Sequence, residues 1–413
     1  MHQLERSIVA MRSLATSPAI RRLFVTSVIA RLPLAMLSVG LMVQIHALTG
    51  SFAAAGVVTA AYGLAVGAGG PMLGRVVDRR GQTLVLLAAG WAGGALLGAI
   101  ALLPAHVSLA LPIVLAAGAG LATPPVGACL RTQLPSLLSD PDALGVAYAF
   151  ETSLVELTWI GGPPLVLGLG VLWSPAGALG SAAAVLVLFT TAFAAEPSSR
   201  AWKPTATAER RTGGSLRAPA MQMLTLALLG VGVLLGADEI AVTAAAHAQH
   251  GTTAAAAPLL ALWGVGSFAG GLLVTRFGRT RGAAAGLTLW LAGLAVGHLA
   301  LIPAAGSTTA MAIVLLVAGA AIAPTESAAF EMVQAVAPAG TVTEAFAWLA
   351  TAIEVGGAIG VAAGGALADY LGPAAAFGLG SGACALVTVI TASRLPKLAG
   401  ARPLPGVAPS QEA

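Results

Sequence analysis

Several charged side chains lie inside long apolar stretches of this 413-residue chain, where charge is rare. The single basic one is Arg31, well inside the apolar stretch 23–48. The acidic ones are Glu151, Glu156, Asp238, Glu239, Glu326 and Glu354. At the centre of a lipid-embedded helix each charge costs about 2.5–3.5 kcal/mol on insertion scales, so each needs a polar surrounding. A poorly solvated carboxylate can bind and release a proton near neutral pH, which makes these acids candidates for proton coupling.

Arg31 has two interpretations, because a guanidinium cannot lose its proton to ease burial. It either forms a permanent ion pair with Glu151 or Glu156, or it binds an anionic substrate. Asp238 and Glu239 are neighbours and point about 100° apart on a helix, so at most one of them is expected to face a shared cavity.

Two further acids, Glu331 and Glu344, lie near the ends of apolar stretches. A charge near the end of a membrane helix is easily solvated, so we expect these two acids to be less important for proton coupling.

Other kinds of chemistry find no support in the sequence. The two cysteines, Cys129 and Cys384, are far apart, and the histidines are scattered without the spacing of a metal site. No GxxxxGK[ST] phosphate-binding motif occurs, and no nucleophile and base stand together inside an apolar stretch. These observations predict a protein that is not an enzyme, holds no metal and needs no cofactor, with a proton gradient as its driving force.

The elements that carry these charges are transmembrane helices. Hydrophobic residues make up 57% of the chain and charged residues 9%, too few charges for the wetted surface of a soluble protein. Helix is the expected form, because lipid leaves open strand edges unpaired. Apolar stretches of about 20 residues, enough to span a bilayer as helix, are found at 23–48, 53–73, 84–103, 107–128, 144–169, 176–195, 221–245, 254–274, 283–302, 310–330, 343–368 and 374–392. The predicted fold is an all-α membrane protein with twelve transmembrane helices.

Basic residues are distributed unevenly between these stretches. Apart from Arg31, every Lys and Arg lies before the first stretch, after the last, or in every second gap. By the positive-inside rule both termini are cytoplasmic, in an integral multi-pass protein of the cell membrane. The basic residues form no interleaved aromatic patch, so we expect no nucleic-acid partner.

The chain divides into two halves around its longest polar segment. We expect a cytoplasmic arm at 1–22, a six-helix bundle at 23–195, a linker at 196–217, a second six-helix bundle at 218–393 and a cytoplasmic tail at 394–413. Weak internal similarity supports the division: residues 62–81 align with 263–282, and 147–156 with 345–354. Parallel six-helix repeats are an architecture of secondary transporters.

The segment GRVVDRRG, Gly74 to Gly81, resembles the loop signature of the major facilitator superfamily. The resemblance implies two six-helix bundles and transport by alternating access. It implies that Gly74 and Gly81 permit close helix contact and a tight turn, while Asp78, followed by Arg79, engages Arg131 and the start of the helix near 343. The corresponding segment of the second half has Arg279 in place of the aspartate, so this latch is expected only once.

The expected function is therefore transport of a small organic solute, with proton-coupled efflux by antiport ranked first. Proton-coupled or facilitated uptake of a sugar or organic anion is the alternative, and Arg31 would suit an anion. A non-transporting receptor or scaffold is a third possibility, although the loops are too short for a signalling domain. The lipid bilayer and the small-molecule substrate are the only partners we expect, and we expect a monomer.

Overall fold

The structure is a computed structural model, which describes residues 17–50, 52–105, 107–138, 141–203, 214–250, 255–277 and 283–400. Within these ranges all regular structure is helical, and twelve helices are long and apolar enough to cross a membrane. The predicted fold class is therefore confirmed.

The helices follow the chain in two sets. The first comprises α2 (Pro18–Thr49), α3 (Phe52–Arg80), α4 (Gln82–Ala101), α5 (Ala110–Leu121), α6 (Val126–Leu137), α7 (Pro141–Leu172) and α8 (Pro175–Ala195). Two short elements follow, α9 (Pro197–Ala201) and the 3₁₀ turn η1 (Ser215–Arg217). The second set comprises α10 (Pro219–His250), α11 (Ala256–Phe277), α12 (Ala283–Leu299), α13 (Leu301–Ala304), α14 (Thr308–Gly319), α15 (Ile322–Val336), α16 (Val342–Leu371) and α17 (Pro373–Gly400).

Local chemistry explains several helix ends. Ser17 and Ser174 cap α2 and α8 with their hydroxyls, and a proline follows each at the first helical position. Gly372 adopts a φ of +88° between α16 and α17, a conformation that suits glycine. The fourth and tenth membrane crossings are each made of two helices, α5 with α6 and α14 with α15.

The helices run beyond the apolar stretches that predicted them. The second was expected to end at residue 73, but α3 continues to Arg80, because helix geometry persists after the chain leaves the hydrocarbon region. The GRVVDRRG segment was expected to lie between two helices. This was wrong: residues 74–80 form the last turns of α3, and only Gly81, with φ +92°, makes the turn into α4.

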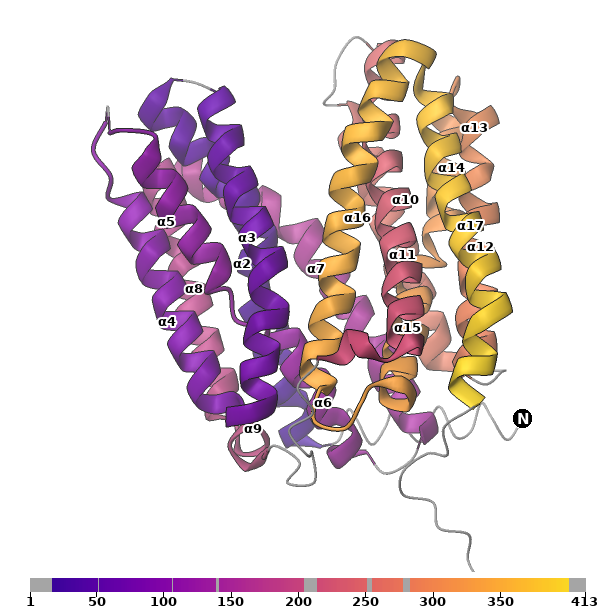
Figure 1. The fold of residues 1–413 in the computed structure, drawn as a ribbon. Helices are drawn as coiled ribbons and strands as arrows, with labels where there is room; N and C mark the ends of the chain where they lie inside the picture. Colours follow the sequence, from indigo (N-terminus) through magenta and orange to yellow (C-terminus); the bar gives the residue numbers. More distant parts are fainter. Residues whose placement is uncertain are drawn as a thin grey trace, which may run out of the picture.

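The two sets of helices stand as two bundles that approach each other at one end and diverge toward the other (Figure 1). We call the end of the molecule where α9 lies the basic end (Figure 1), because α9 contains Arg200, α3 ends at Arg80 and η1 at Arg217. Contacts between the bundles join α3 to α16, and α7 to both α11 and α15. Glycines allow close packing within a bundle, as where Gly236 of α10 lies against the backbone of Gly357 on α16.

Parts of the predicted arm, linker and tail lie outside the described residues, as do Arg279 and its loop. The domain boundaries and the orientation in the membrane therefore stay predictions.

Candidate functional site

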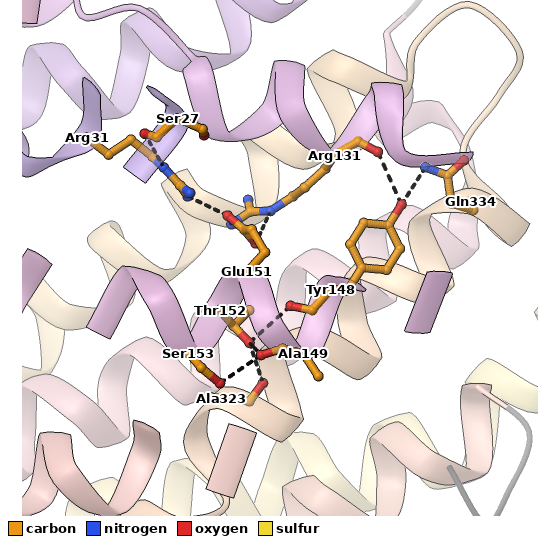
Figure 2. Close-up of polar contacts among 10 residues, drawn as sticks. All are labelled: Ser27, Arg31, Arg131, Tyr148, Ala149, Glu151, Thr152, Ser153, Ala323 and Gln334. Carbon is orange, nitrogen blue, oxygen red and sulfur yellow. Dashed lines mark hydrogen bonds and ion pairs between the residues drawn. The ribbon is translucent and has the colours of Figure 1, made fainter. Parts of the chain in front are cut away.

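A buried triad of charges joins three helices of the first bundle (Figure 2). Arg31 of α2 donates from Nη1 to Oε1 of Glu151 on α7 at 2.5 Å. Arg131 of α6 donates from Nε to Oε2 of Glu151 at 3.0 Å and from Nη2 to Oε1 at 3.1 Å. All three side chains are nearly excluded from solvent. Both oxygens of Glu151 are therefore held by guanidinium groups, in charge-assisted bonds of the stronger kind.

Arg31 is thus an ion-pair partner of Glu151, the first of its two predicted interpretations, but it is not fully satisfied. Its Nε donates to the carbonyl of Ser27 at 3.3 Å, while its buried Nη2 has no hydrogen-bond partner in the described part of the chain. Gly127 of α6 makes room for it, because a Cβ there would lie 3.0 Å from Nη1. The triad carries one net positive charge.

Arg131 also links the two bundles through aromatic side chains. Its guanidinium lies 3.7 Å from the ring centre of Phe330 on α15, close enough for a cation–π interaction. The Tyr148 hydroxyl of α7 donates to the carbonyl of Arg131 at 3.2 Å and accepts from Gln334 of α15 at 3.0 Å (Figure 2). Tyr148 also lies against Phe346 of α16, with ring centres 6.1 Å apart.

A second group of contacts clamps α3 to α16 at the basic end. The carboxylate of Asp78 accepts from the backbone N–H groups of Thr343 at 3.0 Å and Glu344 at 2.8 Å. These are free donors at a helix N-terminus, where a negative charge is favoured. Arg75 grips Glu344 with two hydrogen bonds, at 2.8 and 3.2 Å. Gly74 allows the approach, because a Cβ there would lie 3.0 Å from the Cα of Glu344.

Two expectations about these residues were wrong. Arg131 was expected to engage Asp78, but the structure pairs it with Glu151, which reaches it from the neighbouring helix α7. Glu331 and Glu344 were expected to be solvated, yet they are 8% and 1% exposed because the bundles close over them. Arg79 is exposed and takes no part in the contacts described for the clamp.

Three carboxylates at the interface between the bundles lack a basic ion-pair partner among the described residues. Glu156 of α7 accepts a hydrogen bond from the Ser267 hydroxyl of α11 at 2.9 Å. Glu326 of α15 lies within electrostatic range of Glu156, Glu354 and the triad. Glu354 of α16 is exposed, and its charge acts on Glu326 and on Tyr62 of α3, so it points between the bundles. The interface therefore brings together acidic groups from both halves.

Asp238 and Glu239 separate as their spacing predicts. Asp238 is fully buried inside the second bundle, where Gly380 of α17 and His298 of α12 surround it. Glu239 is exposed. Asp238 is thus no member of the interface group.

Several residues of the site were not singled out from the sequence: Arg75, Gly127, Tyr148, Ser267, Phe330, Gln334, Thr343 and Phe346. One signal was available, because the internal alignment of 147–156 with 345–354 sets Tyr148 opposite Phe346, and the two rings meet in the structure. Among the described residues, no group of three or more His, Cys, Asp or Glu could hold a metal ion.

Comparison with known proteins shows what the chain is similar to. Residues 240–411 match the model of the Major Facilitator Superfamily, and the whole fold has solved counterparts among transporters. The second half of the chain is thus similar in sequence to this superfamily. A search of curated proteins found no match.

Solved structures similar to this chain include transporters named for different substrates. The human organic anion transporter MFSD10 (TETRAN) is 17% identical, with a TM-score of 0.71 over 91% of this chain and 100% of that one. A bacterial homologue of the iron transporter ferroportin, in an outward-facing state, is 15% identical, with a TM-score of 0.73 over 94% and 100%. The proton:xylose symporter XylE, bound to 6-bromo-6-deoxy-D-glucose, is 14% identical, with a TM-score of 0.68 over 91% and 96%. At these identities the likeness shows the fold alone.

Proposed function

We propose that this protein is a secondary active transporter that exports a small organic solute in exchange for protons. The observation that carries the proposal is the group of interface carboxylates without basic partners. Glu156 and Glu326 belong to opposite bundles and act on each other as like charges. Glu326 is within range of the net positive triad, but no basic group of the described residues acts on Glu156, so both carboxylates are not expected to stay ionised without a further positive charge.

That charge can come from a proton or from a cationic group of the solute. Since both would occupy the same carboxylates, binding of one displaces the other, and this competition is the physical basis of exchange. Glu151 is unsuited to the role, because both its oxygens are already held by arginines. We assign it a structural part, holding α2, α6 and α7 together.

Alternating access needs two ends that open in turn. The contacts of Asp78 and Arg75 with the start of α16 hold the basic end closed. With the basic end cytoplasmic, as the distribution of Lys and Arg suggests, this arrangement is outward-facing, like the state named for the ferroportin homologue. The protein then acts as a monomer in the cell membrane, with no enzymatic step and no cofactor, driven by the proton gradient.

The test measures solute and proton fluxes in proteoliposomes with an imposed pH gradient, against a panel of organic cations, sugars and organic acids. We expect an organic cation to move opposite to protons, and Glu326→Gln and Glu156→Gln to abolish the exchange. Glu196→Gln is the matched control, since Glu196 pairs with the exposed Arg22 away from the interface. Solute flux indifferent to pH would remove proton coupling from the proposal.

A second candidate is uptake of an organic anion. The unpartnered Nη2 of Arg31 favours it, because a buried guanidinium donor seeks an anionic or polar acceptor. In the same assay an anion would then move together with protons, and Arg31→Ala would abolish its flux.

A further inference from the structure

One buried acid lies away from the interface between the bundles. Asp238 of α10 is 0% exposed, and both of its carboxylate oxygens lack a hydrogen-bond partner among the described residues. The backbone of α17 comes close at Gly380, where a Cβ would lie 2.9 Å from Oδ1. The nearest polar group recorded is Nε2 of His298 on α12, 4.0 Å from Oδ2.

The hydrogen bonds of His298 establish that its ring is neutral. Trp263 of α11 lies 2.9 Å away and donates its indole N–H to Nε2. An indole nitrogen can only donate, so Nε2 must offer its lone pair. The ring proton therefore sits on Nδ1, which donates to the carbonyl of Leu294 at 2.8 Å.

Among the described residues, no other group supplies a positive charge to Asp238. From α17 the titratable neighbour is Cys384, a buried thiol whose Sγ contacts the carbonyl of Leu291 at 3.6 Å. On α11 the side chain that contacts His298 is the uncharged Trp263, and the group that α12 contributes is the neutral His298 itself. No charged group of α14, α15, α16 or any other described element acts on Asp238. An ionised carboxylate here would lose its hydration without gaining a donor, at an effective cost of several kcal/mol.

We propose that Asp238 binds a proton at a site of its own inside the second bundle, and that Asp238 and Trp263 compete for the single lone pair of His298 Nε2. In the arrangement seen, Trp263 holds that nitrogen and the Asp238 acid stands about 1 Å beyond hydrogen-bond distance. If the Asp238 O–H takes the nitrogen, the indole N–H loses its acceptor. The proton stays on the carboxyl in both arrangements, and only hydrogen bonds are exchanged.

The position of Trp263 gives this competition a route to the interface. Ser267, one turn further along α11, donates to Glu156 of α7, and Gly264 lies against Ile160 of the same helix. A change in the hydrogen bond of Trp263 therefore acts on the helix that contacts the first bundle. The proton site itself does not depend on the proposed direction or substrate of transport.

The test is infrared spectroscopy of the full-length protein with aspartate labelled by ¹³C in its side-chain carboxyl group. The label separates the few aspartates of the chain from its glutamates. At mildly alkaline pH we expect the C=O band of a protonated aspartic acid, which moves in D₂O, and we expect Asp238→Asn to remove it. Asp369→Asn, at an exposed aspartate near the end of α16, is the matched control and should leave the band in place. Absence of the band from the wild type, or its persistence in Asp238→Asn, would overturn the proton site.

A second variant tests the competition. Trp263→Phe removes the rival donor, so the Asp238 O–H should bond to His298 and its C=O band should move to lower frequency. The additional change His298→Phe should reverse that movement. A band that stays put in Trp263→Phe would overturn the competition while leaving the wild-type spectrum to decide on the proton. Asn at position 238 has nearly the shape of a protonated aspartic acid, so folding should survive, and size-exclusion chromatography checks it.

Discussion

Replacing Asp78 with Asn should open the basic end of the protein. The carboxylate of Asp78 accepts one backbone N–H of Thr343 at 3.0 Å and one of Glu344 at 2.8 Å, both at the start of α16. Asn keeps the size of the side chain, but it has one acceptor oxygen, and its amide nitrogen would face the second N–H. One bond is lost, the other becomes neutral, and the negative charge at the helix N-terminus disappears.

The size of the effect follows from these losses. A hydrogen bond to a charged group contributes about 1.5–3 kcal/mol, and a favourable charge at a helix end adds about 0.3–1 kcal/mol. The surviving neutral bond offsets part of this, so we expect the closed state to lose about 2–4 kcal/mol relative to the open one. Since 1.4 kcal/mol is tenfold, the equilibrium should shift by about 30- to 700-fold.

The assay is a distance measurement between labels on cysteines introduced at Arg80 and Ala339, which are exposed near the facing ends of α3 and α16. Native Cys129 and Cys384 are buried, which favours selective labelling. The control is Arg79→Gln, which changes an exposed arginine on the same helix that is no part of the clamp described, and it should leave the equilibrium nearly unchanged. Unchanged distances in Asp78→Asn, or an equal shift in the control, would refute the assignment of Asp78 as the main clamp.

Two further variants test the packing. Glu151→Gln leaves two buried guanidinium groups without their carboxylate and should destabilise the protein by about 3–5 kcal/mol in thermal unfolding. The control Glu196→Gln breaks only a surface pair and should cost about 0–1 kcal/mol. Equal melting curves for the two variants would contradict the role of the triad. Gly236→Ala forces a methyl group against the backbone of α16 and should cost about 1–3 kcal/mol. Gly293→Ala, with nothing within 4 Å of the added group, should be neutral or stabilising, and a similar loss in both would argue against tight packing at Gly236.

The fold was predictable because lipid imposes strong rules. Apolar stretches long enough to span the bilayer must be helices, and the glycine-rich GRVVDRRG segment pointed to the superfamily. Helix ends were harder to predict from the sequence, as at Arg80, where α3 continues beyond its apolar stretch. Hydropathy measures where a helix leaves lipid, whereas the end of the helix depends on local caps such as Gly81.

The residues that carry charge in the site could also be found from the sequence, because charge inside an apolar stretch is conspicuous. Their partners were found only in part, since the pairing of Arg31 with Glu151 was among the expectations and that of Arg131 with Glu151 was not. Arg131 was assigned to Asp78, but Glu151 holds it, because α6 and α7 bring these side chains together while Asp78 is satisfied by backbone groups. The resemblance did predict the contact of Asp78 with the start of the helix near 343, but nothing in the sequence showed that these backbone N–H groups satisfy Asp78 and leave Arg131 to Glu151.

Matching positions in the two repeats also show that the sequence does not reveal which groups a side chain contacts. Glu156 and Glu354 align in the sequence, yet one accepts a hydrogen bond from Ser267 and the other is exposed between the bundles. Duplication of a six-helix unit preserves the position of a residue along its own helix, but the neighbouring helix that this residue contacts can differ between the two halves. Because the free energy of a buried carboxylate depends on that facing group, aligned acids need not titrate or bind alike. Replacing Glu156 and Glu354 singly is therefore expected to affect transport unequally, with the exposed Glu354 the more tolerant of neutralisation.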